Sequence, residues 1–208
     1  MEQLAFGARD AVDRLMTLAP SQPGLESVAV VSGMPFGMTY TPGADVTTSD
    51  KPFLPGRKGY PFAVLIGATP SVFTTIGVPI IQGRGFNARD APGTQPVAIV
   101  SALTARQLFD STDVLGREIL LRMDARTSNA TDVRTVSIIG IAGDTDTQQR
   151  GSRRAGVVYL PLTQHFTSML TMVGRTSGDP AALIPTLKTL AKRADPDLAL
   201  VGPSTAAL

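Results

Sequence analysis

The stretch MLTMVGRTSGDPAALIPTLKTLAKRADPDLALV, residues 169–201, decides the fold. It opens with a strand-length apolar segment at 169–175. Asp179 and Pro180 then mark a helix start, because aspartate caps a first turn and proline is preorganised for the first helical position. Leucines and alanines at spacings of three and four predict the helix itself. Residues 198–201 predict a second strand, so the stretch is a strand–helix–strand unit.

The N-terminal end repeats part of this pattern. Apolar residues at helical spacing between Leu4 and Ala19 predict a helix, and the prolines that follow end it. The β-branched residues within 25–32 then predict a buried strand. Two such units side by side form a split β-α-β sheet. We therefore expect an α+β protein in which the ends, residues 1–58 and 166–208, build one subdomain.

The middle of the chain, residues 59–165, is rich in predicted strands and is expected to form an inserted second subdomain. Its strands are expected at 60–68, 97–100, 117–122, 135–142 and 157–160, and its helices at 70–76 and 102–109. Ser101 is placed to cap the second helix. The polar segment 123–132 predicts a hairpin tip. Before the insertion, residues 34–60 predict a long connection with at most one short edge strand.

Composition excludes several classes of function. Apolar residues make up 43% and charged residues 17%, which favours a folded domain over a disordered one. The net charge of +2 without a basic stripe gives no reason to expect nucleic acid. The chain has no cysteine, hence no disulfide or thiolate metal site. It also has no P-loop motif, no signal peptide and no apolar run of membrane-spanning length. If the domain lies outside the cytoplasm, its export signal is therefore expected elsewhere in a parent polypeptide.

Residues with catalytic potential are few. His165 is the single histidine, and it has no cysteine or second histidine to form a metal site. Asp144 and Asp146 are two residues apart and could share a proton or bind a divalent ion, but no third acid is near in sequence. A solvated loop is the favoured interpretation, and a hydrolase using this pair is the weakest alternative. We expect no catalytic, cofactor-binding or metal-binding residues.

A small basic cluster is the one candidate site. Arg150, Arg153 and Arg154 lie within five residues of one another. An exposed basic loop can receive an acidic partner surface, although such clusters often are only solvated loop tips. These three arginines are the expected partner-contact loop.

Several short pieces, in order over residues 25–201, resemble the MacB-like periplasmic core domain. They are TPSVF (69–73), GVPI (77–80), GRGF (83–86), PVAIV (96–100), ARQLF (105–109), LGREI (115–119), VSIIGIAGD (136–144), VYLPL (158–162) and VGRT (173–176), with Asp-Pro pairs at 179–180 and 195–196. Val114 and Ser101 depart from the family's usual proline and asparagine. These pieces are especially similar to the sequences of permeases without a fused ATPase, which are common in Acidobacteria.

The resemblance implies a periplasmic domain of an inner-membrane FtsX/MacB-type ABC permease. In that family the chain ends form a porter-like subdomain and the insertion forms the Sabre subdomain. The resemblance also implies a non-catalytic role, in which the domain relays ATPase-driven motion and takes no cofactor. The implied partners are the membrane helices of the same parent chain, a second permease copy, an ABC ATPase acting indirectly and, in tripartite pumps, a periplasmic adaptor protein.

One alternative from another class stays open. Residues 34–60 could line a cleft between the two subdomains, where ligands tend to bind. The domain would then be a periplasmic ligand-sensing or substrate-binding module.

Overall fold

The structure is a computed structural model that describes residues 2–33, 43–123, 133–145, 155–167 and 169–202. The helices are α1 (Glu2–Leu18), α2 (Val72–Ile76), α3 (Ala102–Phe109) and α4 (Pro180–Ala194), with a 3-10 turn η1 (Ala19–Ser21) after α1. The strands are β1 (Ser27–Val31), β2 (Gly43–Thr48), β3 (Phe62–Ala68), β4 (Ile80–Gly83), β5 (Val97–Ser101), β6 (Glu118–Met123), β7 (Val133–Ala142), β8 (Gly156–Pro161) and β9 (Thr171–Arg175).

Six of the strands form a closed ring of pairings. The order is β2, β6, β7, β5, β8 and β3, and β3 pairs back with β2. The β3–β8 and β5–β7 pairs are parallel, and the other ring pairs are antiparallel. One apolar cluster takes alternate residues from all six strands, including Leu65, Val100 and Ile138, and α3 adds Ala105 to it. Alternation of this kind is expected when one face of each strand points into a shared core.

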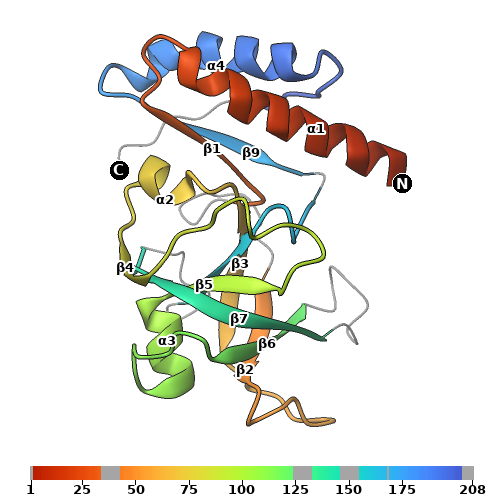
Figure 1. The fold of residues 1–208 in the computed structure, drawn as a ribbon, viewed down its shortest axis with the longest axis vertical. Helices are drawn as coiled ribbons and strands as arrows, with labels where there is room; N and C mark the ends of the chain where they lie inside the picture. Colours follow the sequence, from red (N-terminus) through yellow and green to blue (C-terminus); the bar gives the residue numbers. More distant parts are fainter. Residues whose placement is uncertain (1, 34–42, 124–132, 146–154, 168, 203–208) are drawn as a thin grey trace.

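The two chain ends pack together as a second layer, at the upper end of Figure 1. Strand β1 pairs antiparallel with β9, from Ser27 opposite Arg175 to Val31 opposite Thr171. Helices α1 and α4 cover these strands through a cluster that includes Leu15, Val28 and Leu190. We call α1, β1, β9 and α4 the chain-end layer.

The chain-end layer joins the ring through a short junction between β1 and β3 and through α2. Helix α2 shares a buried apolar cluster with β1 and the ring that includes Val31, Phe73 and Tyr159. Val31 lies opposite Ala68, and Ser32 N donates to the Gly67 carbonyl at 2.8 Å. Two side-chain hydroxyls extend the pairing: Ser32 Oγ accepts from Gly67 N at 2.7 Å, and Thr69 Oγ1 accepts from Val30 N at 2.9 Å. Side chains thus take over where the strand ladder stops, so the backbone stays satisfied across the junction.

The structure departs from the sequence analysis at three strands. Strand β2 is no edge strand, because it pairs with β6 on one side and β3 on the other. Strand β4, which we did not expect, pairs antiparallel with β7 outside the ring. The expected strand at 198–201 does not form: Val201 is 94% exposed, and Lys192 Nζ donates to the Leu198 carbonyl at 2.8 Å. A side chain therefore occupies a backbone acceptor that a neighbouring strand would need.

The other expected elements are confirmed. Helix α3 has the expected bounds, and helices α1, α2 and α4 lie within two residues of theirs. Strands β6 and β7 pair as a hairpin, with Arg122 opposite Val133. Its expected tip at 123–132 lies outside the described residues beyond Met123. The α+β class is therefore confirmed.

Candidate functional site

Ser101 joins three elements at the start of α3. Its Oγ accepts from Thr104 N at 3.2 Å, as an N-cap does, and also from Val157 N of β8 at 3.1 Å. Thr104 Oγ1 in turn donates to the Val157 carbonyl at 3.0 Å. Ser101 is 2% exposed. The expected cap is confirmed, and the buried hydroxyl is a structural group that binds β5, α3 and β8 together.

Asp144, which follows β7, binds the first turn of α3. Its Oδ1 accepts from Leu103 N at 2.6 Å, and its Oδ2 contacts Arg106 Nη2 at 2.5 Å. A carboxylate at a helix N-terminus is stabilised by the free N–H groups and by the helix dipole. Asp146, its expected partner in a carboxylate pair, lies outside the described residues. Both oxygens of Asp144 are therefore engaged in holding α3.

His165 lies half-buried beside the junction. Its Nδ1 is 3.4 Å from Arg134 Nη1, and its backbone N donates to the Pro161 carbonyl at 2.9 Å. Burial lowers the pKa of His165 to about 4, and the positive charge of Arg134 adds to this shift. The imidazole is therefore neutral at neutral pH. Its neighbour is a cation, which cannot serve as the orienting acceptor of a catalytic base.

Arg84 and Asp90 form an ion pair that the sequence reasoning missed. Both Arg84 Nη atoms donate to the Asp90 carboxylate, which also accepts from Asn87 N at 2.9 Å. The hydrogen bonds from Arg84 hold the pKa of Asp90 below its usual range. The pair closes the loop that runs from β4 to β5. The NARD run at 87–90 was the available signal, because asparagine and aspartate favour local turns.

Thr163 and Gln164, which follow β8, bind the same loop. Thr163 Oγ1 donates to the Asp90 carbonyl at 2.6 Å. The Gln164 side chain accepts from Val97 N at 3.1 Å, and its Nε2 donates to the carbonyls of Ala91 and Gln95 at 3.2 and 3.1 Å. This amide thus uses both its acceptor and its donors on one loop. The polar network at this end of the ring is structural in character.

The expected partner-contact residues Arg150, Arg153 and Arg154 lie outside the described residues. Within the residues that are described, no three His, Asp or Glu side chains are grouped as a metal ion would require. No helix in the same part of the chain is both long and apolar enough to span a membrane.

The profile of the MacB-like periplasmic core domain matches residues 5–197 of the chain. The periplasmic region of MacB from Actinobacillus actinomycetemcomitans aligns with a TM-score of 0.55 at 17% identity, over 88% of this chain and 72% of that one. A putative permease domain from Porphyromonas gingivalis gives 0.49 at 19% identity, over 86% and 75%. The extracellular domain of the noncanonic ABC-type transporter YknZ from Gram-positive bacteria gives 0.48 at 16%, over 88% and 80%. A search of curated proteins finds no match.

The similarity to the MacB region shows that the fold is that of a transporter's periplasmic region. The match over 5–197 is more specific, and the chain belongs to the MacB-like periplasmic core domain family. It is a periplasmic domain of a MacB/FtsX-type ABC transporter permease, as the sequence resemblance implied. Transporters of this type work with an ATPase and with membrane-embedded partners.

Proposed function

We propose that this domain is a non-catalytic relay that carries ATPase-driven motion from the membrane to partner proteins in the periplasm. The relevant partners are the membrane helices of the same parent chain, a second permease copy, an ABC ATPase acting indirectly and a periplasmic adaptor protein. In this proposal the motion of the membrane helices passes first to the chain-end layer, then to the ring, and from the ring to the partner proteins. Arg150, Arg153 and Arg154 are kept as a proposed contact for a partner.

The junction between β1 and β3 is the observation that carries this proposal. Both ends of the chain meet in one layer, and that layer is hydrogen-bonded to the ring through Val30, Ser32, Gly67 and Thr69. Thr69 is 5% exposed, so its hydrogen bonds with Val30 are shielded from water. A short, buried and fully paired connection transmits displacement with little loss, since packed interiors deform little.

The state of the polar residues supports a role without catalysis. Asp144 is occupied by α3 and Arg106, and Ser101 is buried among backbone groups. His165 is held neutral beside Arg134. A catalytic group needs a partner that activates or orients it at hydrogen-bond distance.

We also propose the division into a porter-like part, residues 1–58 and 166–208, and an inserted Sabre-like part, residues 59–165. The antiparallel β1–β9 pair and the packing of α1 on α4 support a common part for both ends. The pairing of β2 with β3 and β6, and the place of the following loop at the far end of the ring, favour assigning residues 43–58 to the inserted part instead.

The test weakens the junction in the parent transporter with Thr69→Val. This change keeps the shape of the side chain and leaves Val30 N without its acceptor. We expect ATP hydrolysis to continue while export falls, because the connection between the layer and the ring is looser. Thr74→Val is the matched control, since Thr74 is exposed on α2. Unchanged export in a folded Thr69→Val variant would count against the relay.

A further inference from the structure

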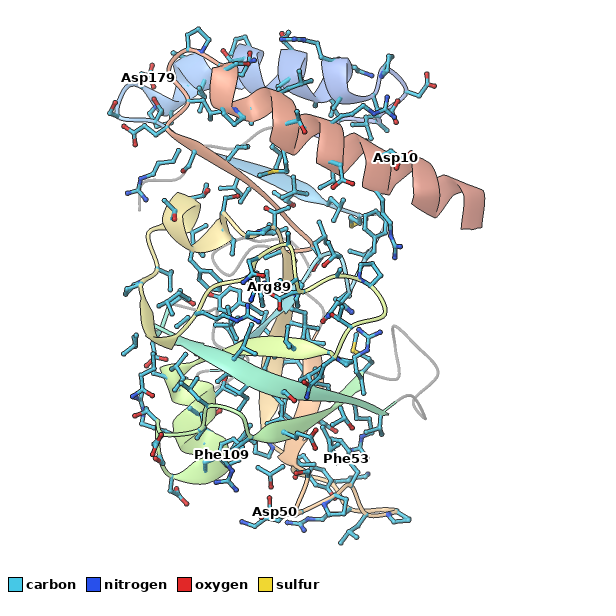
Figure 2. All side chains as sticks on the ribbon, viewed as in Figure 1. Asp10, Asp50, Phe53, Arg89, Phe109 and Asp179 are labelled. Carbon is cyan, nitrogen blue, oxygen red and sulfur yellow. The ribbon has the colours of Figure 1, made fainter. Side chains whose placement is uncertain are left out.

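The loop that joins β2 to β3, residues 49–61, lies at the end of the molecule away from α1 and α4. We call it the distal loop. Asp50 and Phe53 mark its position at the lower end of Figure 2, and Asp10 and Asp179 mark the chain-end layer at the upper end. The structure describes the loop throughout.

The backbone of the distal loop is restricted on both sides of a freer stretch that holds Gly56 and Gly59. It contains prolines at positions 52, 55 and 61, which fix φ. Lys51 N donates to the Thr48 carbonyl at 3.0 Å, and Thr47 Oγ1 donates to the Lys51 carbonyl at 2.6 Å. At the other side, Tyr60 OH accepts from Leu54 N at 2.7 Å. These restraints reduce the conformational entropy that the loop loses when a partner binds.

Two aromatic side chains of the distal loop stack with an arginine of β6. The rings of Phe53 and Tyr60 meet edge to face, with centroids 4.7 Å apart. The Arg122 guanidinium from β6 lies 4.3 Å from the Phe53 centroid and 5.2 Å from that of Tyr60, and it also contacts Asp45 Oδ2 at 2.6 Å. Cation–π contacts and edge-to-face pairs each stabilise such a cluster by about 1 kcal/mol. Both rings are half-buried in this stack.

The outer surface of the distal loop is apolar at one point and basic around it. Leu54 is 50% exposed. Lys51, Arg57 and Lys58 are exposed, and Asp50 is the one acid between positions 49 and 61. The Arg57 guanidinium lies 5.2 Å from the Tyr60 centroid, which orients its charge. An exposed leucine flanked by cations is complemented by an apolar side chain flanked by carboxylates.

We propose that the distal loop is a docking surface for a protein partner that presents carboxylates around an apolar side chain. This inference rests on the proposed function only in assuming that the domain has protein partners. Leu54 supplies the apolar anchor, and Lys51, Arg57 and Lys58 pair with the partner's carboxylates. Arginine and tyrosine are enriched among the residues that dominate interfaces, and complementary charge fixes orientation and increases the association rate.

A protein fits this surface better than an anionic membrane does. Surfaces that bind membranes insert several exposed aromatic or aliphatic side chains beside their cations. In the distal loop the rings of Phe53 and Tyr60 are stacked under Arg122, and Leu54 is the single exposed large apolar side chain between 49 and 61.

The test is a titration of the ¹⁵N-labelled 208-residue chain, followed by NMR. The probe is a synthetic peptide in which aspartates and glutamates flank a leucine. We expect amide shifts confined to residues 49–61 and to β6 beside them. Arg57→Glu with Lys58→Glu is expected to weaken binding by at least about tenfold, and Leu54→Ala to weaken it separately. The control, Lys188→Glu with Arg193→Glu on exposed positions of α4, makes the same charge change and should bind as the parent chain does.

Three outcomes would overturn the docking surface. The first is equal binding of a peptide with asparagine and glutamine in place of the acids. The second is an equal loss of binding in the α4 control. The third is that the chain binds phosphatidylglycerol vesicles and not the peptide, and that the loop variants abolish this vesicle binding. The titration requires neither ATP nor a membrane. Failure of the relay in the transporter therefore leaves this result untouched, and failure here leaves the relay untouched.

Discussion

Arg84 and Asp90 form a two-point ion pair: Nη1 donates to Oδ2 and Nη2 to Oδ1, each at 2.8 Å. The Asp90 side chain is 4% exposed, and that of Arg84 is 44% exposed. The buried carboxylate is thus satisfied by a guanidinium that reaches in from the surface, a geometry in which arginine binds at two points and lysine cannot.

Removal of the guanidinium should therefore destabilise the domain. We expect Arg84→Ala to lower the free energy of unfolding by about 2 kcal/mol, because it leaves a buried charge with one backbone donor, Asn87 N. Arg84→Lys should recover part of this loss. Urea unfolding of each variant measures the effect. Arg89→Ala, at an exposed position in the same loop, is the control and should differ little from the parent chain. Equal stability of Arg84→Ala and Arg89→Ala would contradict the structural role.

The low pKa of His165 predicts a loss of stability in acid. Its pKa falls from an ordinary value of 6.5 to about 4 in the folded chain, so the unfolded state binds the proton more tightly. The stability linked to His165 is present in full above pH 6.5 and is lost as the pH falls toward 4. Because the chain has one histidine, its ring protons can be followed by NMR without ambiguity.

The same titration separates the two causes of that shift. We expect Arg134→Ala to raise the pKa of His165 by less than the whole shift, since burial is the larger cause. A pKa near 6.5 in the folded parent chain would show that the imidazole is hydrated, contrary to this account.

The cap on α3 can be tested with two substitutions that should differ in their cost to stability. Asp144→Ala removes the acceptor for Leu103 N and the contact with Arg106, and should cost about 1 kcal/mol. Ser101→Ala leaves two backbone donors without an acceptor in a buried place and should cost about 2–3 kcal/mol. Thermal unfolding measures both, with the exposed Asp113→Ala as the control. If Asp144→Ala instead abolished a metal-dependent hydrolysis, the enzyme alternative would return.

Tyr159 should tolerate the loss of its hydroxyl. The side chain is fully buried and packs edge to face on Phe73, and its OH lies near the Thr145 hydroxyl without the geometry of a formed hydrogen bond. Burial raises the pKa of Tyr159 to about 12. Removing a buried unpaired polar atom saves its desolvation cost, so Tyr159→Phe should be neutral or about 1 kcal/mol more stable in urea. A clear loss of stability would reveal a partner for the hydroxyl.

Local features of the fold were predictable from the sequence. Ser101 and Asp179 were expected as N-caps, and both accept a backbone N–H from the first turn of their helix. The long apolar strands were also found, because buried strands need continuous β-branched and aliphatic residues. N-caps and buried strands are predictable because each depends on residues that are close together in the sequence.

Features that depend on distant partners were not predictable in this way. Strand β2 contains Gly43, Asp45 and two threonines, a composition that suggested an edge, yet strands far along the chain enclose it on both sides. Strand β4 has four residues and is defined by its pairing with β7. The side chain of Gln164 binds a loop about seventy positions earlier. Periodicity carries no information on such contacts.

The relay is tested most directly by distances between spin labels in the parent transporter, measured with and without trapped nucleotide. The domain has no cysteine, so Asp113→Cys between α3 and β6 and Lys188→Cys on α4 can be labelled at exposed sites. We predict that the distance between the position-113 labels of two permease copies changes with nucleotide state, while the distance from position 113 to position 188 within one copy stays constant. An unchanged distance between copies, or a change taken up entirely within one copy, would contradict the relay.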